Sequence, residues 1–253
     1  MEETLRSLVA IAFALLLVML RLDAERFGVA EYTAAAAGDR WTVLGRRFAW
    51  FVLGLALIGI VAVIHPGPPG ALGLQFGDRG AVLLLGLAYA TLGAAQAIAV
   101  ARLRFGRLRT SRPSSYPWPL LNALATALVD EAAFRGIILG LLLVTGLDAG
   151  VAIVIQALVY TLATRTGVPG RDLYLLACAL GLGLAGGWLT VETGGIGAAV
   201  VGHVATRFAV AVLLERADGD ETGDRDDADE PDEPDEPDEP EGGPAVTGAP
   251  GRR

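Results

Sequence analysis

The stretch LLNALATALVDEAAFRGIILGLLLVTGL, residues 120–147, decides the fold of this chain. It is long enough to cross a bilayer core, which takes about 20 apolar residues. It nevertheless carries Asp130, Glu131 and Arg135 within about one and a half helical turns. A charge at the centre of a bilayer costs about 2.5–3.5 kcal/mol even on mild scales. These side chains should therefore face the interior of a helix bundle.

Six further apolar stretches accompany this one. The chain is 53% hydrophobic with a mean hydropathy of +0.50. The six stretches lie near residues 5–22, 44–64, 80–101, 149–164, 173–190 and 195–214. All 13 prolines fall outside the seven stretches, as expected for uninterrupted helices. The sequence thus predicts an all-α fold, a polytopic membrane bundle of about seven transmembrane helices.

Arginines between these stretches predict the orientation of the bundle. Five lie in the connection 21–47 and five in 102–112, with two more in 165–172. The alternate connections are poor in arginine, since 65–79 holds one and 191–194 holds none. Basic residues in short loops accumulate on the cytoplasmic side. We therefore expect a multi-pass protein of the cell membrane, with the N-terminus outside and the C-terminal tail in the cytoplasm.

Charge separates the tail from the body. Residues 217–253 hold 15 of the 28 acidic residues and repeat Asp-Glu-Pro from Asp229 to Pro240. Such a segment cannot bury an apolar core, so we expect a disordered acidic tail of a halophile-like kind. It would serve as a solvating tail or as a docking arm for basic partners. The sequence predicts N-terminal transmembrane helices with Arg-rich loops in 1–117, a polar-residue-bearing transmembrane core in 118–216, and this tail in 217–253.

Three of the apolar stretches carry polar side chains four residues apart, which places each set on one helix face. The sets are Asn122, Thr126 and Asp130; Gln156, Tyr160 and Thr164; and His203 and Arg207. Lipid would not accommodate such faces. We therefore expect Asp130, Glu131, His203 and Arg207 to converge in one interior cluster. Two arginines there would balance two carboxylates, and Arg207 would form a bracing ion pair with Asp130 or Glu131.

The order of these motifs resembles one family. Asp-Glu-x-x-x-Arg, Tyr-x-x-x-Thr, a Gly-rich helix ending in Thr193-Gly194, and His-x-x-x-Arg resemble the CPBP family of CAAX-processing and bacteriocin-processing (Abi) intramembrane proteases. The family pattern is Glu-Glu-x-x-x-Arg, Phe-x-x-x-His and His-x-x-x-Asn. The resemblance covers roughly 118–214. Gly183 and Gly187 in the Gly-rich helix should let neighbouring helices approach closely.

Carried over by position, the resemblance makes Asp130, Glu131 and His203 the candidate catalytic residues. The supporting positions are Arg135, Tyr160, Thr164 and Arg207. Two positions change the chemistry, because Thr164 stands for the family's water-activating His and Arg207 for its oxyanion-supporting Asn. A threonine can orient water but is no base, whereas an arginine can stabilise an oxyanion.

These departures leave three functions open. The first is a CPBP-type intramembrane endopeptidase acting on membrane-embedded or prenylated-type peptides. The second is a catalytically dead protease fold, a pseudoenzyme, that binds membrane segments or partner proteins, which the missing His at Thr164 favours. The third is a transporter with a buried charged site, against which the lack of broken spans and inverted repeats argues.

The sequence predicts the lipid bilayer and a peptide as partners, and no nucleic acid. No His-Glu-x-x-His occurs and arginines next to the carboxylates oppose a cation, so we expect no metal and no cofactor. His65 is expected to be an exposed loop histidine. The tryptophans at positions 41, 50, 118 and 188 lie near span ends, where we expect them to anchor the membrane interfaces.

Overall fold

The structure is a computed structural model that describes residues 2–29, 40–105, 117–165 and 173–214. Within these ranges it is all-α, as predicted, and it has seven continuous helical segments. They are α1 (Glu2–Leu22), α2 (Arg40–Ile64), α3 (Arg79–Phe105), a run of α4 (Pro117–Glu131), η3 (Ala132–Ile138) and α5 (Leu139–Val144), then α6 (Ala149–Arg165), α7 (Leu173–Thr193) and α8 (Gly197–Leu214). A 3-10 helix, η1 (Pro69–Leu72), follows α2. The predicted acidic tail lies outside the described residues.

Several helices are suited to a membrane. In the described ranges, four stretches are long and apolar enough to cross one: Glu2–Leu22, Trp41–Ile64, Arg79–Leu103 and Leu176–Thr193. Parts of α6 and α8 form two shorter apolar helices. Large apolar side chains such as Leu15, Leu84 and Leu158 are exposed on the outer faces, where lipid would cover them. The helices indicate a multi-pass membrane protein.

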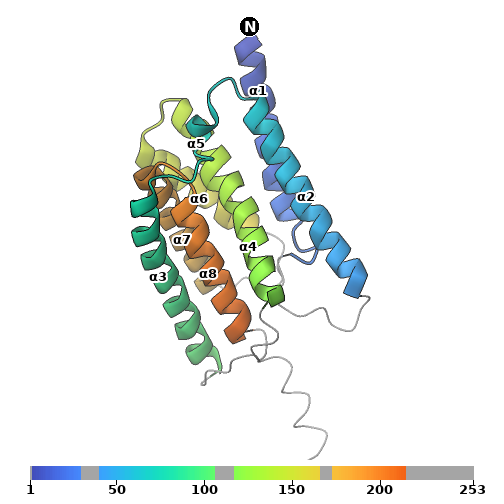
Figure 1. Ribbon diagram of the computed structural model, residues 1–253, viewed down its shortest axis with the longest axis vertical. Coiled ribbons are helices and arrows are strands. Elements are labelled where there is room, and N and C mark those ends of the chain that lie inside the picture. Colours follow the sequence, from blue (N-terminus) through green and yellow to red (C-terminus); the bar gives the residue numbers. More distant parts are fainter. Residues whose placement is uncertain (1, 30–39, 106–116, 166–172, 215–253) are drawn as a thin grey trace, which may run out of the picture. The chain divides into compact units, whose positions relative to one another are not determined.

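The run α4–η3–α5 is the central element of the bundle (Figure 1). Its first part packs against α8, and η3 packs against α1, α2, α6 and α7. The side chains at 129–137 are buried without a break. The charged residues of this stretch therefore face protein on every side, as their cost in lipid requires.

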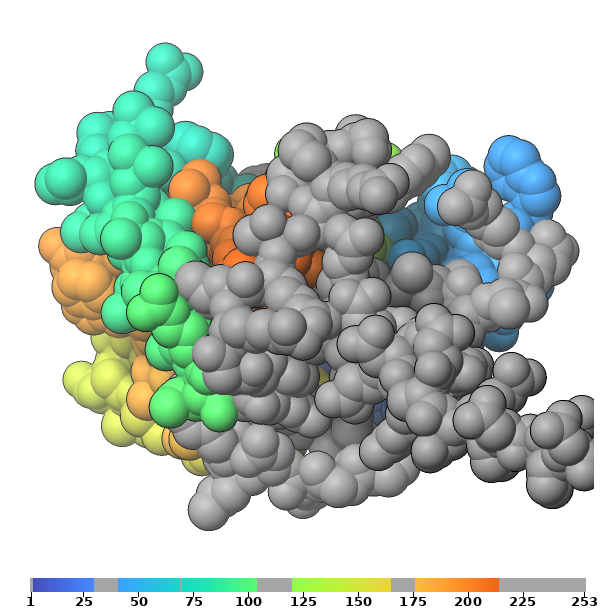
Figure 2. Space-filling model, turned by 90° about the horizontal axis from the view of Figure 1, so that it is seen from below, coloured from blue at the N-terminus to red at the C-terminus, as the bar shows by residue number. Residues whose placement is uncertain are grey.

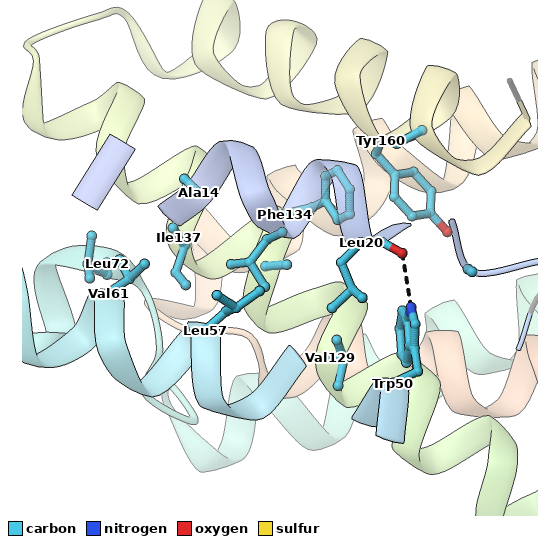
Figure 3. Packing of buried hydrophobic residues seen from close by; sticks show 14 of the residues in the cluster. Ala14, Leu20, Trp50, Leu57, Val61, Leu72, Val129, Phe134, Ile137 and Tyr160 are labelled. Atoms are coloured by element: carbon cyan, nitrogen blue, oxygen red, sulfur yellow. Dashed lines mark hydrogen bonds between the residues drawn. The ribbon is translucent and has the colours of Figure 1, made fainter. Parts of the chain in front are cut away.

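An apolar core fills the space between α1, α2 and η3 (Figure 3). Leu57 and Val61 of α2 pack there with Phe134 and Ile137 of η3. Leu72 of η1 is also fully buried in this core. Leu72 therefore anchors the connection that contains η1 in this core, next to α2 and η3.

Glycines let α3 and α8 approach closely, and Figure 2 shows these two helices side by side. Gly93 of α3 faces Thr206 of α8, and Gly202 of α8 faces Tyr89 of α3. A Cβ atom at either glycine would collide with its neighbour. Small residues serve the same purpose between other membrane helices. This contact fixes α8 and therefore the position of the site residues it carries.

The predicted close approach at Gly183 and Gly187 is also present. A Cβ at Gly183 of α7 would lie 3.0 Å from the Cβ of Ala157, and one at Gly187 would lie 2.9 Å from Oε1 of Gln156. Both partners are on α6. The glycines of α7 thus bring the polar face of α6 close to the centre of the bundle.

Candidate active site

The central helix widens directly after Glu131. Residues Ala132–Ile138 form a π-helix, whose hydrogen bonds span one residue more than those of an α-helix. Such turns are rare and frequently occur at functional sites. Across it, Nε of Arg135 lies 3.2 Å from Oε2 of Glu131, and both side chains are about 1% exposed. Residues four apart share one helix face, and here the two form a fully buried ion pair.

Glu131 also reaches α8. Its Oε1 lies 2.6 Å from Nδ1 of His203. An ionised carboxylate only accepts hydrogen bonds, so a neutral His203 donates from Nδ1 and keeps the lone pair on Nε2. A carboxylate that orients an imidazole in this way is the arrangement by which enzymes prepare a histidine to accept a proton. We call Glu131 and His203 the reactive pair.

Tyr160 of α6 lies between the two partners of Glu131. The guanidinium carbon of Arg135 is 4.0 Å from the centre of the Tyr160 ring, a cation–π contact. The same ring stands edge-on to His203, with 6.3 Å between ring centres. Nη2 of Arg135 also donates to Leu182 O at 3.4 Å. Gly186 provides the room for this guanidinium, because a Cβ there would lie 3.0 Å from Nε.

Asp130 faces α1 instead. Its Oδ1 lies 3.5 Å from Nε of Arg21, and the two side chains are 1% and 5% exposed. The expectation that Arg21 lies in the connection 21–47 is wrong, because Arg21 belongs to the last turn of α1 and is buried. Its only signal in the sequence is its place directly after an apolar block, which equally suits an arginine reaching toward the membrane surface.

Arg207 is buried on α8, one turn after His203. Its Nη2 donates a hydrogen bond to the backbone oxygen of Val29 at 3.2 Å. Asp130 forms its ion pair with Arg21 of α1; the predicted pairing of Arg207 with Asp130 or Glu131 stays a prediction. Asp130, Glu131, His203 and Arg207 are all at most 5% exposed. They lie in the interior, as expected from their helix faces.

Polar atoms of other residues in the predicted stripes are buried as well. Oγ1 of Thr164, Oγ1 of Thr126 and both amide atoms of Gln156 have no hydrogen-bond partner among the described residues. Gln156 is fully buried. Buried polar atoms of this kind ordinarily bind water or a ligand. No group of three or more His, Cys, Asp or Glu side chains in the described ranges is placed to hold a metal ion.

Two further expectations about single residues are wrong. His65 is buried rather than exposed, and its Nδ1 accepts a hydrogen bond from Gly67 N at 3.1 Å. Trp50 is also buried, and its indole nitrogen donates to Leu20 O at 3.0 Å (Figure 3). Trp41 and Trp188 are exposed, as interface anchors would be.

The comparison with known protein families agrees with the motifs. Residues 112–209 match the family model described as type II CAAX prenyl endopeptidase Rce1-like. The chain contains a domain of the Rce1-like CPBP family. The Rce1-like domain includes the reactive pair, Arg135, Tyr160, Thr164 and Arg207, and it confirms the predicted resemblance. No curated protein and no solved structure gives a match. Arg21 and Val29, which contact the domain's side chains, lie outside the matched residues.

Proposed function

We propose that this chain is a membrane-embedded peptide hydrolase in which His203, oriented by Glu131, activates water. The observation that carries the proposal is the 2.6 Å contact between Nδ1 of His203 and Oε1 of Glu131 in a buried site. Nε2 of His203 accepts a proton from water as the water attacks a peptide carbonyl, and the same nitrogen later protonates the leaving amine.

Arg207 is the group that stabilises the oxyanion in this proposal. It follows His203 by four residues on α8 and so lies on the same helix face. Its guanidinium already binds one peptide carbonyl oxygen, that of Val29. A charged donor in a site that excludes water stabilises developing negative charge more strongly than a neutral amide does.

The substrate class follows from the family and the membrane. The matched family is named for endopeptidases that act on CAAX prenyl proteins. We infer that this chain acts on a peptide that lies in or at the bilayer, of the prenylated type. All seven helices would span the membrane, with the N-terminus outside and the C-terminus in the cytoplasm.

The test uses the full-length protein in lipid nanodiscs and a set of internally quenched peptides, with and without a farnesyl group. His203→Ala and Glu131→Gln should each lower turnover by about 10²–10⁴-fold. The control is His65→Ala, which removes the other histidine of the chain and should leave turnover unchanged. Wild-type turnover equal to that of His203→Ala on every peptide would refute the proposal.

A binding protein without catalysis is the alternative that specific residues favour. Arg21 neutralises Asp130, at the position of the family's catalytic Glu, and Thr164 replaces a histidine. In that case the wild type binds the peptides but does not cleave them. The pair of changes Thr164→His and Arg207→Asn, which restores the family's residues, should then give cleavage where the wild type has none.

A further inference from the structure

Two site residues of the Rce1-like domain are held by a segment that lies outside it. Arg21 contacts Asp130, and Val29 O accepts a hydrogen bond from Arg207. We propose that the segment Arg21–Val29 is a built-in part of the site, and that Arg21 is a positioning residue that keeps Asp130 apart from the reactive pair. The matched domain alone would then be an incomplete site.

Helix α2 anchors both ends of this segment. The indole nitrogen of Trp50 donates to Leu20 O at 3.0 Å, the carbonyl directly before Arg21. Nε of Arg47 donates to Gly28 O at 2.7 Å, the carbonyl directly before Val29. Trp50 and Arg47 are three residues apart and share one face of α2. The peptide groups directly before Arg21 and Val29 are thus both held by hydrogen bonds from α2. Support of this kind from neighbouring residues fixes the geometry of a site.

Backbone hydrogen bonds within the segment also hold it in a turn. Val29 N donates to Ala24 O at 3.0 Å, and Gly28 N donates to Glu25 O at 2.8 Å. Gly28 has a φ of +68°, which a side chain would oppose. Ala24 and Val29 are 2% and 0% exposed. The segment is therefore a compact turn packed into the bundle, suited to hold Arg21 in one place.

Arg21 separates the roles of two adjacent carboxylates. Neighbouring residues on a helix point about 100° apart, so Asp130 faces α1 while Glu131 faces α8. With Arg21 present, Asp130 has its own cation, and Arg135 remains with Glu131. Without Arg21, a buried anionic Asp130 competes for Arg135, and Glu131 loses the contact that holds it against His203. This inference deepens the proposed function, since it concerns the same reactive pair.

The test reads His203 directly, so that it does not depend on turnover. The chain has two histidines, His65 and His203, and nitrogen-15 labelling of histidine gives one set of imidazole signals for each. The wild-type His203 should show the form protonated at Nδ1. In Arg21→Met the His203 signals should shift while those of His65 stay. Adding Asp130→Asn removes the unpaired carboxylate and should return the His203 signals to their wild-type positions.

Arg26→Met is the matched control. Arg26 lies in the same segment, but its pair with Asp23 is at the surface, where the two side chains are 82% and 46% exposed. It should leave the His203 signals unchanged. Trp50→Phe removes the donor to Leu20 O and keeps a smaller aromatic ring in the core. It should shift the His203 signals in the same direction as Arg21→Met, by a smaller amount.

Three results would overturn the inference. The first is an unchanged His203 signal in Arg21→Met. The second is a double variant whose His203 signal is no closer to the wild type than that of the single variant. If Arg21→Met does not fold, the test uses Arg21→Lys and the double variant, because neither leaves a carboxylate unpaired. The third refuting result is that neither of these two variants folds with wild-type His203 signals. A wild type that cleaves no peptide refutes the proposed function but leaves this test in place.

Discussion

Glu131 has a different neighbour on each carboxylate oxygen, Arg135 on Oε2 and His203 on Oε1. Such a carboxylate is fixed in position and has little freedom to turn toward a substrate. In the proposed mechanism it is therefore the orienting group, and the imidazole of His203 accepts the proton. The two residues are separated by 72 positions in the sequence, so the pair exists only once α4 and α8 have packed.

At the scale of a single residue, Arg135→Met should destabilise the bundle strongly. It leaves Glu131 buried beside His203 without its arginine, and removing one partner of a buried ion pair costs about 3–5 kcal/mol. Unfolding of the purified protein in mixed micelles measures the loss. Arg6→Met is the control, because Arg6 pairs with Glu2 at 3.1 Å with both side chains more than half exposed, and pairs of that kind contribute little. Equal effects of the two changes would contradict the structure.

Gln156→Leu tests whether the buried amide is hydrated. Both amide atoms of Gln156 lack a partner in the described ranges, and an unsatisfied buried polar group costs about 1–3 kcal/mol. If the amide is dry, leucine of similar size should raise the free energy of unfolding by that order. Ala157→Gly, on the neighbouring position of α6, is the reference for a change that loosens packing and lowers helix propensity without altering a polar group. A loss of stability in Gln156→Leu would show that the amide holds water.

The spacing of residues in the sequence was sufficient to predict which site residues share a helix face. Glu131 with Arg135, and His203 with Arg207, follow from a spacing of four. Arg21 could not be predicted, because its pairing with Asp130 depends on which helices become neighbours in the bundle. Its place directly after an apolar block is the one local difference from Arg26, which is five residues further on and exposed.

At the scale of the elements, the helices follow the apolar pattern closely. The stretches predicted at 5–22 and 195–214 correspond to Glu2–Leu22 and Gly197–Leu214. The ends differ by a few residues because capping groups outside the apolar block, such as Asp78 before α3, set where a helix begins. The π-helix at Ala132–Ile138 was not predicted, because no residue pattern in the sequence is specific to a π-helix.

Gly202→Ala should weaken the contact between α3 and α8. The added methyl group meets the ring of Tyr89, whose hydroxyl donates to Leu182 O. Overpacking of this kind costs about 1–3 kcal/mol, and thermal unfolding should detect it. In Gly59→Ala the new methyl group meets nothing within 4 Å, so helix propensity should make that change neutral or stabilising by roughly 0.5–1 kcal/mol. The same response at both glycines would argue against the close approach of α3 and α8.

At the scale of the whole molecule, the arginine-rich connections predict the topology. Protease added to the cytoplasmic face of inverted vesicles should digest the Asp-Glu-Pro repeat and leave the bundle intact. Protease on the other face should not reach the repeat. Digestion of the repeat from the outer face would reverse the predicted orientation.

Deletion of 220–253 should leave the bundle folded. Residues Met1–Asp218 form a compact unit of their own, and the deleted residues contain few apolar side chains that could stabilise it. The truncated protein should insert into the membrane and keep the thermal unfolding midpoint of the full chain. A marked fall in that midpoint would show that the acidic residues contribute to the stability of the bundle.

The pair of Arg21 and Asp130 has a consequence for how the protein is made. Helix α1 leaves the ribosome before α2 and α3, and Asp130 arrives only with α4. An arginine without its partner is costly inside a bilayer, so during synthesis Arg21 must remain near the water until the fourth helical segment has been inserted. Helix α1 then takes its final depth only when the helix with the two carboxylates is in place. Translation order thereby couples the final placement of α1 to the insertion of the helix that carries Asp130.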